Sequence, residues 1–153
     1  MAEGGGDQEG RQLFCRVITP EQVLYDGEAK LVVVRIADGD IGVNVDHAPV
    51  VSTVEPREVR IYEENDEKHV FATSDGFFKV SENLVQILVE EAQTPDEIDV
   101  NEAESRIEQA ENELSELPAE DEEGETERQR KEIERRRQVA ENLVRVAREY
   151  GEG

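Results

Sequence analysis

Residues that build covalent or metal cross-links are scarce in this sequence, which has one cysteine and two histidines among 153 residues. The single cysteine, Cys15, excludes a disulfide framework within the chain and a thiolate metal cage. No apolar run approaches the roughly 18 residues of a membrane-spanning helix. The first ten residues are Gly-rich and acidic and lack the basic and apolar regions of a secretory signal. We therefore expect a disordered leader over residues 1–11 and a cytosolic protein that reaches a membrane only through a partner.

Positive charge is also in short supply. Lys and Arg number 17 against 39 Asp and Glu, which gives a formal net charge of -22 at pH 7. Such a chain repels phosphate backbones and offers no basic groove, so we expect no nucleic-acid binding. Two interpretations of the acidity stay open: a basic protein partner, or a surface suited to high salt.

Groups that perform catalysis are few. Neither His47 nor His69 has a Glu or Cys at the usual metal-ligand spacing, which predicts no metal site. Residues 38–46 resemble a calcium loop superficially, but Gly42 stands where a third ligand is needed. The chain also lacks a G-x-S-x-G elbow and a phosphate-binding G-x-x-x-x-G-K loop. We therefore expect no independent enzyme.

Short apolar runs separated by turn residues fill the region from residue 13 to residue 90. The predicted strands are Leu13–Thr19, Val23–Tyr25, Leu31–Ile36, Gly42–Val45, Val50–Val54, Val59–Tyr62, Val70–Ser74, Phe77–Val80 and Leu84–Val89. The dipeptide Asp26-Gly27 predicts a hairpin turn after the second of them. Many short strands at this spacing predict an antiparallel β-sandwich or barrel.

The apolar period changes to a helical one near residue 100. The first stripe has a 3-4-3-4-3 spacing and consists of Val100, Ala103, Ile107, Ala110, Leu114 and Leu117. The second stripe consists of Ile133, Ala140, Leu143, Ala147 and Tyr150, with Arg136 as an interruption. Two amphipathic helices joined by a short acidic turn predict an antiparallel hairpin. Its alanine-rich seam fits either a marginally stable surface hairpin or a switch with two arrangements.

Two capping boxes mark the expected helix starts. Asp99 precedes Glu102 at the spacing of the first box, and Thr126 precedes Gln129 at the spacing of the second. We therefore predict an all-β N-terminal sandwich followed by a C-terminal antiparallel α-helical hairpin. The predicted boundaries are a leader over residues 1–11, a β-sandwich domain over 12–92 and a helical hairpin domain over 93–153.

The order of several motifs adds a family resemblance to this prediction. The matching stretches are Asp38–Val43, His47–Val51, Pro56, Val59–Ile61 and Ser74–Val80. Followed by the two-helix tail, they resemble the epsilon subunit of the F-type ATP synthase over residues 13–150. The resemblance implies a sandwich of about ten strands in the central stalk of a proton-translocating synthase. It also implies a non-catalytic subunit that couples rotation of the c-ring, through gamma, to ATP synthesis at the cytoplasmic face of the cell membrane.

The resemblance also implies an interface with gamma and the c-ring. Asp40 matches the family's acidic ring contact and His47 its loop histidine, and Ile41, Ala48 and Pro49 lie in the same motifs. The alternative is that Asp40 is a turn residue and His47 a packing residue. Where the family usually has Pro-Gly before the histidine, this chain has Val45-Asp46.

Some members of the family bind ATP in the hairpin, and this chain keeps Ile98, Asp99 and Ala103 of their motif. Glu102 stands at the position of the motif arginine and would repel the phosphates. The other ATP-binding positions hold Gln93, Gln109, Val139 and Leu143. We therefore expect weak or absent ATP binding and no other cofactor.

A basic cluster in the second helix is the last feature. It consists of Arg128, Arg130, Lys131, Arg135, Arg136 and Arg137. The resemblance implies that an extended tail transiently meets the alpha/beta head and restrains ATP hydrolysis. Alternatively, these cations pair with Glu120–Glu127, Glu108, Glu111 and Glu113 across the hairpin. The rival function is a generic β-sandwich adaptor whose charged hairpin recruits a protein partner. A third alternative is a stand-alone ligand-binding barrel.

Overall fold

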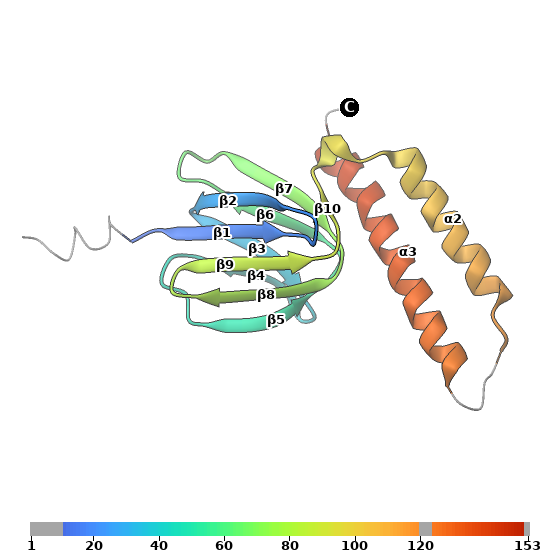
Figure 1. Ribbon diagram of the computed structural model, residues 1–153. Helices are drawn as coiled ribbons and strands as arrows, with labels where there is room; N and C mark the ends of the chain where they lie inside the picture. The colour runs from blue at the N-terminus through green and yellow to red at the C-terminus, as the bar shows by residue number, and fades with distance from the viewer. Residues whose placement is uncertain (1–10, 120–123, 152–153) are drawn as a thin grey trace, which may run out of the picture. The chain divides into compact units, whose positions relative to one another are not determined.

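The computed structural model describes residues 11–119 and 124–151 and contains ten strands and two long helices (Figure 1). The chain divides into two compact units between Thr94 and Pro95. The predicted boundary at residue 92 falls inside the last strand, β10 (Ala92–Gln93). Most of the predicted leader, residues 1–10, and residues 120–123 of the predicted acidic turn lie outside the described residues.

The first unit is a sandwich of two five-stranded sheets, which confirms the predicted fold class. The first sheet has the order β2-β1-β9-β8-β5 and contains β1 (Leu13–Ile18), β2 (Val23–Ala29), β5 (Val50–Val54), β8 (Gly76–Ser81) and β9 (Leu84–Val89). The second sheet has the order β10-β7-β6-β3-β4 and adds β3 (Leu31–Ile36), β4 (Gly39–Val43), β6 (Glu58–Tyr62) and β7 (Lys68–Thr73) to β10.

Strand pairing is antiparallel except between β1 and β9, where Phe14 lies opposite Leu84 in a parallel register. The sequence predicted an antiparallel sandwich, and this pair departs from it. A parallel neighbour needs a long connection, and here the seven strands from β2 to β8 provide it between β1 and β9. The first strand is thereby held between β2 on one side and β9 on the other.

The core lies between the sheets and is built from alternate residues of the strands. On β1 the side chains of Leu13, Cys15 and Val17 are buried while Phe14 and Arg16 are exposed. The largest side chain that is fully buried is Phe78, in β8. Each large apolar side chain of this kind contributes about 1.5–3 kcal/mol on burial.

Cys15 lies in the core, and the strand pairing beside it corrects one turn prediction. Burial raises the pKa of the Cys15 thiol to about 12, so Cys15 is a small core residue and not a reactive thiolate. The hairpin predicted at Asp26-Gly27 is wrong, because both residues lie inside β2 and Gly27 pairs with Cys15. A side chain at Gly27 would contact the ring of Tyr25, which covers the glycine and lets the strand continue. The β3–β4 turn lies at residues 37–38, and Gly39 follows it with φ 127°.

The second unit contains a short 3-10 helix, η1 (Pro95–Glu97), followed by α2 (Val100–Glu116) and α3 (Glu125–Tyr150). The Asp99 cap is confirmed, because its carboxylate accepts the backbone N–H of Glu102 at 3.1 Å. The second box is wrong. Helix α3 begins after Gly124, which has the left-handed φ of 75°, and Thr126 is buried inside the first turn. A glycine that reaches this conformation without strain starts the helix two residues earlier.

The two helices lie side by side (Figure 1), and ion pairs show that they run antiparallel. Arg148 donates to Glu104 at 2.9 Å, and Arg136 donates to Glu113 at 2.6 Å. Ala103 and Ala110 are the buried residues of α2. The buried residues of α3 are Thr126, Ile133, Val139, Ala140, Asn142, Leu143, Val144 and Val146. Within the described part of the chain, no helix has the length and apolar character that a membrane span requires.

Candidate functional interface

The outer face of the first sheet carries an exposed group of apolar side chains. Pairing places Leu88 of β9 between Ile18 of β1 and Phe77 of β8, so that a row crosses three strands. Val51 of β5 lies one row away, opposite Lys79. We call Ile18, Val51, Phe77 and Leu88 the apolar patch.

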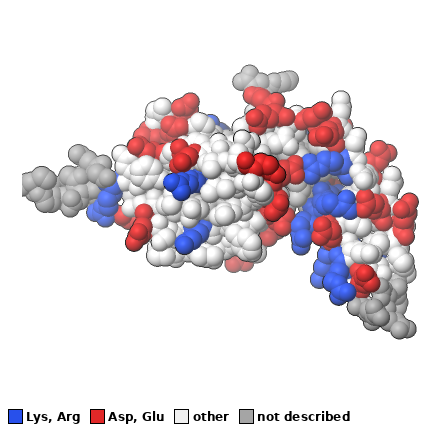
Figure 2. Space-filling view, in the orientation of Figure 1, with Lys and Arg blue, Asp and Glu red and all other residues white. Residues whose placement is uncertain are grey.

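The apolar patch is unusually open to solvent. The exposed fractions are 60% for Phe77, 45% for Leu88 and 70% for Val51. Figure 2 shows that the face of the sandwich above β1, β9 and β8 is largely white, with acidic side chains gathered mainly around it. In a chain of net charge -22, a group of apolar side chains this exposed marks a surface for protein–protein contact.

A hollow of about 440 Å³ lies at one end of the apolar patch and is lined by residues 18–20, 75–77 and 88–90. Gly76 forms part of its wall. A Cβ atom at this position would collide with the backbone carbonyl of Leu88 and contact Val89. The glycine therefore allows β8 and β9 to approach closely at the edge of the patch.

Asp40, the predicted ring contact, lies in β4 opposite Arg35 of β3. The Arg35 Nε donates to Asp40 at 2.8 Å, and an Arg60 guanidinium nitrogen lies 3.7 Å from the other carboxylate oxygen. The hydrogen bond from Arg35 and the charge of its neighbours lower the pKa of Asp40, against a smaller opposing effect of burial. Asp40 is thus a paired strand residue, and its interpretation as a turn residue is wrong. The neighbouring Ile41 is half-buried against the core.

His47, Ala48 and Pro49 lie in the loop between β4 and β5, with Ala48 and Pro49 exposed. The His47 ring Nδ1 lies 2.7 Å from the Ala48 carbonyl oxygen. Asp46 has φ 66°, the left-handed region that glycine favours and that Asp tolerates. The departure from the family's Pro-Gly therefore keeps a backbone shape that a glycine would adopt.

The loop is tied to its surroundings through Asp46. The carboxylate of Asp46 accepts a hydrogen bond from Arg11 at 2.9 Å, and its backbone N–H donates to the Asn83 side chain at 2.6 Å. Asp40 lies near the start of β4 and His47 beyond its end. Among residues 11–119 and 124–151, no hydrogen bond or ion pair joins the two predicted contacts.

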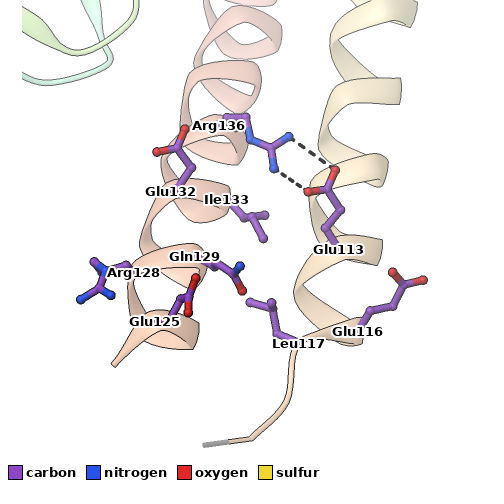
Figure 3. A pocket seen from close by; sticks show the side chains of 9 residues that line it. All are labelled: Glu113, Glu116, Leu117, Glu125, Arg128, Gln129, Glu132, Ile133 and Arg136. Atoms are coloured by element: carbon purple, nitrogen blue, oxygen red, sulfur yellow. Dashed lines mark hydrogen bonds and ion pairs between the residues drawn. The ribbon is translucent and has the colours of Figure 1, made fainter. Parts of the chain in front are cut away.

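The second group of predicted residues lies in the hairpin. Figure 3 shows a pocket at the end of the hairpin, of about 650 Å³, where Arg136 of α3 reaches Glu113 of α2. Arg135 and Arg137 lie 3.9 Å from Glu132 and 3.8 Å from Glu141 on their own helix.

The remaining cations of the basic cluster differ from these three. In the described part of the chain, Arg128, Arg130 and Lys131 form no ion pair. Among the described residues, the expected pairing across the hairpin is found for Arg136, and the acidic residues 120–123 lie outside the described residues.

The remnants of the ATP motif have structural roles. Ile98 and Ala103 are buried, and the Asp99 carboxylate caps α2. A hollow of about 420 Å³ beside Ile98 has a single cation among its lining residues, Arg148. Because Arg148 pairs with Glu104, little positive charge is directed at a nucleotide there.

The apolar patch was missed by the reasoning from sequence. Its signal is visible in β9, where the outward positions 84 and 88 carry leucine although the inward positions 85 and 87 already supply the core. A strand that is apolar on both faces indicates a second buried surface.

Known proteins of similar sequence belong to one family. A family described as "ATP synthase, Delta/Epsilon chain, beta-sandwich domain" matches residues 12–95. An ATP synthase epsilon chain of Rubrobacter xylanophilus is 66% identical over 145 residues, which cover 95% of this chain and 98% of the relative. An ATP synthase epsilon chain of Brevibacillus brevis is 38% identical over 94 residues, covering 61% of this chain and 71% of the relative.

Solved structures show the same fold at lower identity. A chain from the mitochondrial ATP synthase of Euglena gracilis, solved as OSCP/F1/c-ring, has a TM-score of 0.68 at 21% identity. The match covers 87% of this chain and 79% of the other. A chain from the central stalk/c-ring of the Tetrahymena thermophila mitochondrial ATP synthase has a TM-score of 0.52 at 11% identity, covering 85% and 96%.

The geometry of Asp40 predicts a pH-dependent contribution to stability. Its pKa in the folded state lies below the ordinary value of 3.8, so its ion pairs contribute fully above that value. The contribution is lost as the pH falls through the lowered pKa. We expect Asp40→Asn to reduce the free energy of unfolding by less than about 1 kcal/mol at pH 7, since the pair is partly exposed.

Urea unfolding of parent and variant at pH 7 and at about pH 3 tests this. The difference in the free energy of unfolding between parent and variant should be smaller at the lower pH. The matched control is Asp38→Asn in the adjacent turn, which should leave stability near the parent value at both. A difference for Asp40→Asn that is equal at both pH values contradicts the assignment.

Proposed function

Because the chain belongs to the ATP synthase epsilon chain family, we propose that it is a non-catalytic subunit of the central stalk. In this role it couples rotation of the c-ring, through the gamma subunit, to ATP synthesis by the alpha/beta head. The family match over the sandwich and the relative that is 66% identical along nearly the whole chain carry this proposal. The resemblance inferred from the motifs is thereby confirmed.

The apolar patch is the surface we assign to gamma. A stable contact between subunits needs a desolvated apolar centre, and Phe77 and Leu88 offer side chains of that kind on a rigid sheet. Lys79 and Gln86 form the next row across the same strands and supply a polar margin. A torque-transmitting contact benefits from this arrangement, since the backbone beneath it is fixed by sheet hydrogen bonds.

We assign the contact with the c-ring to the β4–β5 loop and to Asp40. The exposed Ala48 and Pro49 offer apolar contact area, and His47 is half-buried beside them. Asp40 already shares its charge with Arg35 and Arg60, so its electrostatic contribution to a ring contact is modest. Association with the membrane, at its cytoplasmic face, then comes through the complex.

The rival functions find less support. The generic adaptor is not favoured by any of the comparisons, which consistently return ATP synthase chains. A ligand-binding barrel needs an open interior, but Phe78, Ile61 and Ile87 fill the space between the sheets.

We assign regulation to Arg128, Arg130 and Lys131. Within residues 11–119 and 124–151 these cations form no ion pair, and their positive charge suits an acidic segment of the head. Arg135, Arg136 and Arg137 each have a carboxylate partner and contribute less. Opposite charges would guide the tail to the head in a salt-dependent way.

The first prediction from the proposed function concerns the affinity for the gamma subunit. Leu88→Ala should weaken binding of the full chain to gamma by roughly tenfold, because it removes a side chain from the centre of the patch. Leu31→Ala is the matched control, since Leu31 lies on the outer face of the other sheet. Titration calorimetry of the two purified subunits measures the effect. Equal affinity for parent and Leu88→Ala would exclude the patch as the gamma surface.

The second prediction concerns ATP. Titration calorimetry of the full chain with Mg-free ATP should show no micromolar site, since each missing charge-assisted contact removes roughly 1.5–3 kcal/mol. Restoring the motif arginine alone, with Glu102→Arg, should leave binding weak because Gln93, Gln109 and Val139 still occupy other positions of the site. Micromolar affinity in the parent chain contradicts the proposal.

The third prediction concerns the basic cluster. In the assembled complex, Arg128→Gln with Arg130→Gln should raise ATP hydrolysis about two- to fivefold, since each surface ion pair contributes on the order of 1 kcal/mol or less. Arg135→Gln with Arg137→Gln carries the same charge change on the same helix and should leave the rate near the parent value. Equal rates in both variants would remove the assignment.

A further inference from the structure

Three potential metal ligands lie close together at the hairpin between β6 and β7. This hairpin belongs to the second sheet, whereas the apolar patch lies on the first. One carboxylate oxygen each of Glu63 and Glu67 and a ring nitrogen of His69 lie within 4.8 Å of one another. Among the described residues, it is the one group of at least three His, Cys, Asp or Glu side chains whose ligand atoms lie this close together. We propose that Glu63, Glu67 and His69 bind a divalent transition-metal cation of the zinc class.

The hairpin brings together residues that looked too far apart in the sequence. Ile61 pairs with His69 across β6 and β7, which folds the chain back on itself. The Glu63 N–H donates to the Glu67 carbonyl at 2.8 Å and closes the turn, and Asp66 takes φ 67° within it. The strand register therefore places two glutamates near His69, which the spacing in the sequence did not indicate.

The imidazole distinguishes this group from an ordinary acidic surface. Its ring lies against Tyr25 of β2, with centroids 5.0 Å apart and planes at 58°. Its Nε2 lies 2.5 Å from a Glu63 carboxylate oxygen, and both side chains are only 32% exposed. The histidine is thus held in one orientation, and a fixed imidazole loses little entropy when it binds a metal.

The donor set fits a zinc-class ion in type and charge. Imidazole nitrogen and carboxylate oxygen bind Zn²⁺ at about 2.0–2.2 Å, which places tetrahedral ligand atoms roughly 3.3–3.5 Å apart. The Nε2 and Glu63 atoms would separate by about 1 Å, and the exposed Glu67 would move inward. A neutral imidazole with two carboxylates balances a divalent cation, and waters would complete the coordination.

Neighbouring charges favour a cation at this place. Lys30, a nearby basic residue, already donates to Asp66 at 2.7 Å, which reduces its repulsion. The Tyr25 hydroxyl donates to the Glu28 carbonyl at 2.9 Å, which holds the ring in place beside His69.

The test is titration calorimetry of the chelator-treated full chain with ZnCl₂ at pH 7.5. The acidic surface binds zinc weakly everywhere, so each variant has a charge-matched control. Glu67→Gln is compared with Glu64→Gln in the same turn, and His69→Gln with His47→Gln. We expect one saturable site in the parent, weakened at least about tenfold by Glu67→Gln and by His69→Gln and unchanged in both controls.

Thermal unfolding of each variant without metal checks that the fold is retained. If His69→Gln unfolds, the test still stands on Glu67→Gln, because Glu67 is an exposed turn residue whose substitution should not disturb the fold. Visible absorption of the Co²⁺ complex gives a second readout, because it should disappear in His69→Gln and remain in His47→Gln. The proposal is overturned by the absence of a saturable site in the parent. It is equally overturned if all four variants match the parent, which would leave Glu63 and His69 as a simple ion pair.

Discussion

The register of β8 against β9 is the constraint on which both the core and the interface depend. Side chains alternate between the two faces of a strand, so the pairing that buries Phe78 and Ile87 also turns Phe77 and Leu88 outward. A slip of one residue would exchange the two sets and place Lys79 in the core. The close contact at Gly76 helps to exclude such a slip, because any other residue collides with the backbone of β9. The apolar patch is therefore as well defined as the core itself.

Local patterns in the sequence account for most of the fold. Strand alternation located nine of the strands, and the apolar period of 3.6 located both helices, because these signals depend on neighbouring residues alone. The errors have tertiary causes. Asp26-Gly27 has turn chemistry, but the ring of Tyr25 covers the glycine and pairing with β1 continues through it. Thr126 has cap chemistry, but the left-handed Gly124 starts the helix before it. The parallel β1–β9 pair joins distant parts of the chain and leaves no local signal.

The functional residues divide along the same line. Asp40 and His47 could be proposed because they lie within contiguous motifs, whereas the apolar patch draws on four strands and the proposed Glu63–Glu67–His69 group on a hairpin register. In both missed cases the residue types were visible and their proximity was not. An outward leucine in β9 becomes meaningful only when Phe77 and Ile18 lie beside it. Sites assembled by strand pairing therefore need the register before their chemistry can be read.

The distribution of charge also bears on the acidity of the chain. A basic partner would need unpaired carboxylates on the surface that it contacts, but the apolar patch presents Phe77, Leu88 and Val51 instead. At Asp40 the carboxylate is held by Arg35 and Arg60, which satisfies its charge within the subunit. Contacts built from apolar area and internally paired charges depend little on ionic strength, because screening acts mainly on exposed, unpaired charge. We therefore infer that the excess of 39 acidic over 17 basic residues serves solvation of the surface rather than recognition of these two partners. Arg128, Arg130 and Lys131 form no ion pair among the described residues and are the exception. We propose that they contact the head, and salt should weaken that contact before it weakens the contact with gamma.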